Sequence, residues 1–171
     1  MYRLESFGAA GAIVTNDAFP YQSTFRADDA AHAELIVVGL NQQVMLTELA
    51  QVRFEIETTV LELDDGLRLQ TDRESRAELF STYRNLMDGL IPDTHWKAAN
   101  GWKMVTFDDM KPMARAMAAH VRGCYSGEGA VAVAIGNATT MAQIEAINVR
   151  GQFTEAYQAA FDEIMTAEPV A

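Results

Sequence analysis

The clearest hydrophobic period in the sequence lies in residues 42–58. Four apolar residues recur there at steps of four, three and four: Met45, Leu49, Val52 and Ile56. This spacing predicts an amphipathic helix, and Asn41 before it is a plausible N-cap. Helices also pair between chains through stripes of this kind. Two heptads are too few to show whether the stripe forms a coiled coil. The stripe therefore packs either into the core of this chain or against a second copy.

Capping signals predict where the later helices begin. Thr71 and Glu74 have the spacing of a capping box, and the helix after them ends near Gly89. Thr106 caps a third long helix, with Pro112 in its first turns. Glycines end this helix, and shorter helical segments follow. The glycines are Gly127 and Gly129. The first of the following helices spans 130–135, the second begins at the capping box of 140–143, and the third spans 152–167.

Two β-hairpins are predicted from alternating runs around tight-turn residues. Residues 59–63 and 67–70 flank Asp64-Asp65-Gly66, where Glu62 and Arg68 could pair across the strands. In the second hairpin, Asn100-Gly101 provides the left-handed turn geometry. Its strands carry Trp96 and Trp102, which would then be neighbours across the turn.

Residues 1–41 show no sustained helical period, because glycines and a proline interrupt short apolar pieces. They are predicted to form an extended N-terminal arm. The β-branched run of Ile36, Val37 and Val38 before Gly39 is typical of a strand, and one short strand needs a partner. The partner is either a later hairpin of this chain or another chain.

Together the patterns predict an α+β fold. A small helical module with two β-hairpins spans 42–150, an extended arm at 1–41 precedes it, and a C-terminal helix at 151–171 follows. With 171 residues, 49% hydrophobic and 22% charged, the chain can bury about 70% of its extended surface and build a core without metals or disulfides.

Charge and targeting signals narrow the possible partners. Thirteen Lys and Arg against 24 Asp and Glu give a net charge of -11, the opposite of what binding to phosphates requires. Nucleic acid and anionic membranes are therefore unexpected partners. No secretory signal is read at the N-terminus, and the apolar runs at 35–40 and 130–135 are far shorter than the ~20 residues of a membrane span. A soluble protein is expected, in which the single Cys124 cannot form an internal disulfide.

A search for catalytic chemistry yields no strong candidate. His32, His95 and His120 are far apart in the sequence, so no zinc site is expected, and no cofactor is predicted. His120 and Cys124 lie one helical turn apart but have no third orienting group, which favours core positions. The pairs Asp64-Asp65 and Asp108-Asp109 could serve as acid and base, yet a turn and a helix N-terminus already explain them. We therefore expect a protein that is not an enzyme.

Several motifs together carry a resemblance to a known family. They include 69–76 (Leu-Gln-Thr-Asp-Arg-Glu-Ser-Arg), 96–102 (Trp-Lys-Ala-Ala-Asn-Gly-Trp), 105–107, His120-Val121 and 139–144. The segment from about Leu49 to Asn148 resembles a domain of unknown function found in tail-region proteins of tailed bacteriophages. The resemblance implies no catalytic residues. The family pattern has a continuous helix where this chain has Pro112, so the chain differs from the family at this position.

The resemblance implies a structural component of a tail fibre or baseplate, located in the virion tail and, during assembly, in the host cytoplasm. The implied partners are other tail proteins. Self-association, giving a homo-oligomer, is expected separately from the stripe of Met45 to Ile56. An assembly chaperone that leaves the virion is the first alternative, and a glycan-cleaving tail enzyme is the second. The candidate partner-binding residues are Ile36, Val37, Val38, Met45, Leu49, Val52, Ile56, Trp96 and Trp102.

Overall fold

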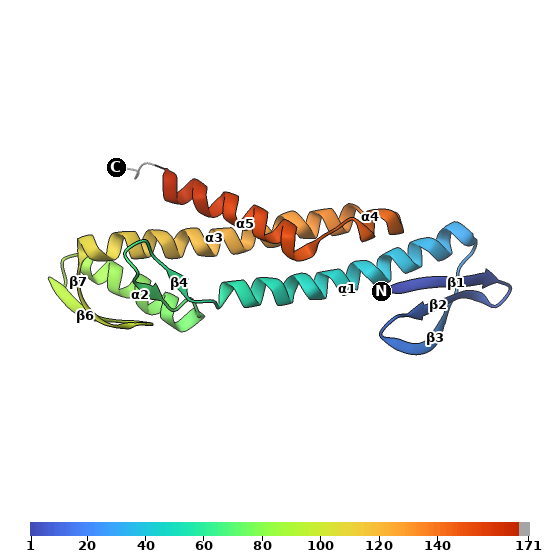
Figure 1. The fold of residues 1–171 in the computed structure, drawn as a ribbon, viewed down its shortest axis with the longest axis horizontal. Helices are drawn as coiled ribbons and strands as arrows, with labels where there is room; N and C mark the ends of the chain where they lie inside the picture. The colour runs from blue at the N-terminus through green and yellow to red at the C-terminus, as the bar shows by residue number, and fades with distance from the viewer. Residues whose placement is uncertain (168–171) are drawn as a thin grey trace. The chain divides into compact units, whose positions relative to one another are not determined.

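The structure is a computed structural model that describes residues 1–167, apart from the side chains of residues 19–21. Within this described range the chain forms five helices and three small antiparallel sheets (Figure 1). This confirms the predicted α+β class. The contacts divide the chain into two units. The first is Met1–Val52 with Glu128–Phe153, and the second is Arg53–Gly127 with Thr154–Ala171. Whether 42–150 folds as a module of its own stays a prediction.

The N-terminal residues form a three-stranded meander in the first unit. Its strands are β1 (Tyr2–Gly8), β2 (Gly11–Asn16) and β3 (Phe19–Phe25), in the order β1-β2-β3. Along β2, Ala12 and Val14 are buried whereas their neighbours are partly exposed, as expected for a strand with one face on the core. Residues 2–25 do form strands, but the strands pair with one another, and residues from Ala30 onward are helical, so the predicted extended arm at 1–41 is wrong. Docking of this segment to another chain stays a prediction.

The predicted strand at Ile36–Val38 is wrong. Helix α1 runs from Ala30 to Glu57, so it includes these residues and begins twelve residues before the predicted helix. The reason is that the buried stripe of α1 starts at Ala33 and continues through Val37 to Met45 at helical spacing. Packing of this stripe outweighs the strand propensity of β-branched residues.

Asn41 lies inside α1 and is not its N-cap. Its side chain is fully buried (0% exposed). Oδ1 accepts a hydrogen bond from the backbone N–H of Tyr2 (2.8 Å), and Nδ2 donates to the backbone oxygens of Tyr2 (2.9 Å) and Val37 (3.1 Å). The amide thereby satisfies both backbone groups of a residue in β1, and it attaches the meander to α1.

Helix α1 is the one described helix that is long and apolar enough to span a membrane by length and composition alone. A third of its most apolar window is buried within the protein, and a core helix of a soluble protein meets the same criteria. The buried Asn41 in its middle is bonded to other parts of the chain, which agrees with a core helix.

Helix α3 extends from Phe107 to Asn137, so the predicted break at Gly127 and Gly129 and the separate helix at 130–135 are wrong. The predicted Thr106 cap is confirmed. The Thr106 hydroxyl accepts from the Asp109 N–H (3.4 Å), while the Asp109 carboxylate accepts from the Thr106 N–H (2.9 Å). Pro112 lies inside the helix, which continues through it.

The chain ends in two further helices. The capping box at Thr140 and Gln143 is confirmed at the start of α4 (Met141–Glu145). Helix α5 runs from Val149 to Thr166, close to its predicted range. By residue number, α1, α3 and α5 each contribute to both units.

The second unit contains both predicted hairpins. Strands β4 (Leu61–Glu62) and β5 (Arg68–Leu69) pair antiparallel, and Gly66 takes a φ of 79° in their turn. The predicted Glu62–Arg68 pair is present, with 3.7 Å between Oε2 and Nε. Strands β6 (Asp93–Ala98) and β7 (Gly101–Thr106) form the second hairpin.

Helix α2 runs from Arg73 to Met87 between the two hairpins. Its N-cap is Asp72, whose carboxylate accepts hydrogen bonds from the N–H groups of Glu74 and Ser75. The predicted cap, Thr71, is buried instead and donates its hydroxyl proton to the backbone oxygen of Thr59. The prediction was therefore one residue early.

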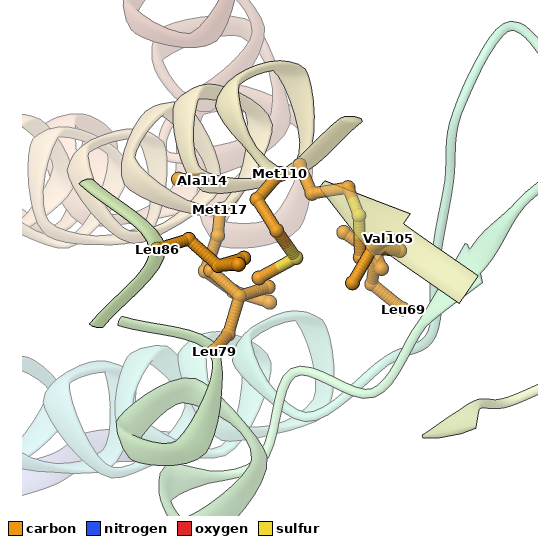
Figure 2. Packing of buried hydrophobic residues seen from close by; sticks show 8 residues of the cluster. Leu69, Leu79, Leu86, Val105, Met110, Ala114 and Met117 are labelled. Atoms are coloured by element: carbon orange, nitrogen blue, oxygen red, sulfur yellow. The ribbon is translucent and has the colours of Figure 1, made fainter. Parts of the chain in front are cut away.

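The core of the second unit lies between α2, α3 and the hairpins. Figure 2 shows Leu79 and Leu86 of α2 pointing toward Met110 and Met117 of α3. Leu69 of β5 and Val105 of β7 belong to the same cluster. Methionine is unbranched and flexible, so it fills the irregular space between a helix pair and two hairpins.

The close approach of α3 and α5 can be tested at Gly123. A Cβ atom there would lie 2.7 Å from Cδ2 of Tyr157 and 3.0 Å from its backbone oxygen. Gly123→Ala is therefore expected to lower the free energy of unfolding by about 1–3 kcal/mol, measured by urea denaturation.

Gly129→Ala is the matched control for this substitution. Gly129 is also in α3, and nothing lies within 4 Å of an added Cβ. Here the gain in helix propensity should stabilise the protein by about 0.5–1 kcal/mol. A Gly123→Ala protein as stable as the wild type would contradict the close packing of the two helices.

Candidate functional site

Most predicted partner-binding residues lie in the core of the chain itself. Val37, Val38, Met45, Leu49 and Val52 are each at most 5% exposed. The apolar stripe of α1 thus packs into the core of this chain, which is the first of the two interpretations of its spacing. Ile36 and Ile56 are partly buried.

Trp96 and Trp102 are brought together at an open groove in the second unit, which we call the tryptophan groove. It has a volume of about 650 Å³. One wall comes from α2 and the other from β6 with the start of β7. Its lining residues are Ala77, Glu78, Ser81, Thr82, Thr94, His95, Trp96, Lys97 and Trp102.

The two tryptophans differ in environment because of the hairpin register. Trp96 pairs with Lys103, and the next residue, Lys97, pairs with Trp102. Neighbouring pairs point to opposite faces of a hairpin. Trp96 packs against the core cluster, whereas Trp102 is 69% exposed. The sequence therefore predicted the proximity of the tryptophans correctly but not their different faces.

The tryptophan groove offers an aromatic platform with a cation beside it. Nζ of Lys97 lies 5.9 Å from the ring centroid of Trp102, within reach of a cation–π contact. The Nε1 atom of Trp96 is buried and has no hydrogen-bond acceptor among the described residues. An exposed tryptophan beside a groove can bury much apolar area against a partner at low entropic cost, which is typical of binding hot spots.

A second cavity of the same unit, which we call the carboxylate pocket, has a volume of about 370 Å³. It lies where the β4–β5 hairpin meets the first turns of α3 and the end of α5. Its apolar lining comes from Leu63, Leu67, Pro112, Met113, Ala116, Phe161 and Met165, and its charged lining from Glu62, Asp64, Asp65, Lys103, Asp108 and Asp109. Both predicted aspartate pairs thus border one pocket.

The predicted local roles of these aspartates are also confirmed. Oδ1 of Asp65 accepts from the Leu67 N–H in the hairpin turn (3.0 Å), and Asp109 caps α3. These backbone hydrogen bonds hold the pKa of Asp65 and of Asp109 below the usual range. Both side chains are therefore firmly ionised at neutral pH. Sequence reasoning missed the convergence because the two pairs are more than 40 residues apart.

No group of three or more His, Cys, Asp or Glu side chains is placed to hold a metal ion in the part of the chain that the structure describes. Two of the pocket aspartates instead form ion pairs at the surface. Asp65 lies 3.5 Å from Nζ of Lys103, and Asp108 lies 2.8 Å from Nζ of Lys111.

His120 forms a buried polar contact between helices. Nδ1 lies 2.8 Å from the Tyr157 hydroxyl, and Nε2 lies 3.2 Å from the backbone oxygen of Glu57. A carbonyl oxygen only accepts, so Nε2 carries the proton and Nδ1 accepts from the tyrosine. Burial, helped by the positive charge of Arg76, lowers the pKa of His120, and burial raises the pKa of Tyr157 to about 12.

Cys124 lies beside this contact, with Sγ 3.9 Å from Nε2 of His120. The pairing foreseen from helical spacing is therefore real. Both side chains are only 2% exposed, however, and Nε2 faces the Glu57 carbonyl. A nucleophilic thiolate needs access to a substrate and a base to take its proton. These positions instead fit a role in holding the helices together.

Comparison with known proteins gives the chain a family. Residues 41–149, well over half of the chain, match the family described as Domain of unknown function (DUF4376). The chain belongs to this family. No curated protein matches the chain, and no solved structure does. Both the tryptophan groove and most of the carboxylate pocket lie within the matched residues, while Phe161 and Met165 lie beyond them.

The lowered pKa of His120 gives folding a pH dependence of defined sign. The unfolded chain takes up a proton on this histidine near pH 6.5, which the folded protein resists. Stability is thus complete above about pH 6.5 and falls as the pH drops from there toward the folded pKa, by at most about 1.4 kcal/mol per pH unit. Urea denaturation at pH 7.5 and 5.5 should show this loss.

His120→Gln should reduce the loss between the two pH values, whereas His95→Gln, at an exposed histidine, should leave it unchanged. NMR titration of the His120 ring measures the folded pKa directly and does not depend on the stability of a variant. A pKa at or above 6.5 would rule out this source of pH dependence.

Proposed function

We propose that the protein is a non-enzymatic structural component of a bacteriophage tail, associated with the fibre or baseplate, which acts through protein–protein contacts. The observation that carries the proposal is the tryptophan groove with Trp102 69% exposed beside it. A large aromatic side chain held out on a hairpin gains from burial against a partner. The tail assignment itself rests on the resemblance of the motifs at 69–76 and 96–102.

The charge of the protein supports binding to polypeptides. With a net charge of -11, it repels nucleic acid and anionic lipid at a distance. Because Met45, Leu49 and Val52 are buried, self-association in this proposal uses other side chains, such as the exposed Leu35 and Phe54 of α1.

Mass spectrometry of purified phage particles from the source of this gene tests the proposal. The chain is expected in the particles at a fixed ratio to known tail subunits. Trp102→Ser should lower its incorporation at least severalfold, because the variant loses the side chain that a partner would bury. Val133→Ser is the control, since Val133 is 63% exposed but lies in the other unit.

Absence of the chain from particles would contradict a structural role. If the chain then co-purifies with fibre subunits from infected cells, it is the assembly chaperone. Equal incorporation of both serine variants would show that the tryptophan groove is not the contact surface.

A second candidate function, cleavage of a glycan, is favoured by one observation, the convergence of two aspartate pairs on the carboxylate pocket. Glycosidases need one carboxyl group with a raised pKa as the general acid. The pKa values of Asp65 and Asp109 are lowered instead, which disfavours these two as the acid.

Release of new reducing ends from host cell-surface polysaccharide tests this second function. The leading proposal expects none from the purified protein. Release that is lost in Asp64→Asn/Asp108→Asn but retained in Glu48→Gln/Glu155→Gln would establish the glycan-cleaving enzyme and overturn the leading proposal. The control removes the same charge at exposed positions outside the pocket.

A further inference from the structure

We propose that the carboxylate pocket is a binding site for an arginine side chain of a partner polypeptide. This inference rests on the proposed function, since it names the chemistry of one contact to a partner. It concerns a surface distinct from the tryptophan groove, because no residue lines both cavities.

The size and lining of the pocket fit one long side chain. Its volume of about 370 Å³ is at the low end of the range for ligand pockets, roughly 300–1,000 Å³. The apolar part comes from Met113 on α3 and from Phe161 and Met165 on α5. An aliphatic stem can pack on such a surface while its charged head stays near water.

The charges at the rim favour a cation as the occupant. Five carboxylates and one ammonium group line the pocket. Asp64 forms no ion pair or hydrogen bond through its side chain within residues 1–167. The pairs that the others make, such as Asp65 with Lys103 and Glu62 with Arg68, involve exposed side chains. Exposed pairs contribute at most about 1 kcal/mol each, so an incoming cation can replace them at low cost.

Arginine matches the pocket better than lysine or a metal ion. Its guanidinium group is planar, weakly hydrated and able to bind two carboxylate oxygens at once, so it tolerates the apolar floor. Lysine carries a compact, strongly hydrated charge. For a metal ion, the described residues provide no suitable cluster of ligands.

NMR titration of the full chain with N-acetyl-arginine amide tests the site. The matched probe is N-acetyl-citrulline amide, which has nearly the same shape without the charge. The arginine probe should shift the amide signals of Leu63, Met113 and Phe161, and the citrulline probe should not. Raising the salt concentration from about 20 to 300 mM should weaken the effect, since the Debye length shortens below 10 Å.

Two variants should move the affinity in opposite directions. Asp64→Asn/Asp108→Asn should bind the arginine probe about three- to tenfold more weakly, as expected for two lost ion pairs. Lys103→Gln removes the cation that lines the pocket and should bind severalfold more tightly. A general loss of structure cannot produce that gain. Glu48→Gln/Glu155→Gln, at exposed positions outside both cavities, has the same net charge as the aspartate variant and should bind like the wild type.

Other outcomes overturn the inference. The inference fails if both probes bind equally well, or if the arginine probe shifts only signals of residues outside the pocket. It also fails if the variants do not change the affinity, or if a cell-wall oligosaccharide shifts the pocket signals and the arginine probe does not. Particle analysis separates this failure from that of the proposed function. If the chain is in the particles and Asp64→Asn/Asp108→Asn is incorporated normally, only the arginine site is wrong. If the chain is absent, the proposed function has failed.

Discussion

The second unit depends on a largely buried ion pair between Glu57 and Arg76. Nη1 of Arg76 lies 2.8 Å from Oε1 of Glu57, whose other oxygen binds Arg53, and the Glu57 side chain is only 11% exposed. Loss of the Glu57 carboxylate would remove this partner from the Arg76 guanidinium, whose side chain is only 19% exposed, and removing one member of a largely buried pair is destabilising. The backbone oxygen of Glu57 also accepts from His120. One residue at the end of α1 thus fixes α2 and α3, which carry a wall of the tryptophan groove and part of the carboxylate pocket.

The packing of α5 on α3 completes the pocket. Gly123 lets the Tyr157 ring approach α3, and Tyr157 stacks on Phe161 one turn later, with 5.9 Å between the ring centroids. Further along, the Arg115 guanidinium donates to the backbone oxygen of Ile164 (2.6 Å from Nη2), which satisfies a carbonyl in the last turn of α5. These contacts place Phe161 beside Met113 in the pocket lining. The apolar floor is therefore a product of helix packing that no local sequence motif encodes.

Local signals in the sequence predicted the hairpins and most of the helix starts, because an Asp-Gly or Asn-Gly turn and a capping box act within a few residues. Errors arose where distant contacts decide. Residues 30–41 are helical because Val37 is buried and Asn41 is bonded to Tyr2, 39 residues away. Gly127 did not end α3, since a glycine in a long helix costs only about 1 kcal/mol against alanine, and packing can offset that. One wall of the tryptophan groove was predictable, because the turn at Gly101 brings the two tryptophans near each other. The other wall comes from α2, and no local signal places that helix beside the hairpin.

The aspartates show why a local explanation of a residue does not exclude a second role. In Asp65, Oδ1 accepts the hydrogen bond that shapes the hairpin turn, while Oδ2 faces Lys103 at the pocket. The hydrogen bond to the turn stabilises the ionised form, so the same contact that fixes the backbone keeps a negative charge at the rim. Asp109 does this at the start of α3, where the N-terminal backbone N–H groups also favour an anion. Turn and cap chemistry therefore create the electrostatic character of the pocket, which emerges only when the hairpin and α3 come together.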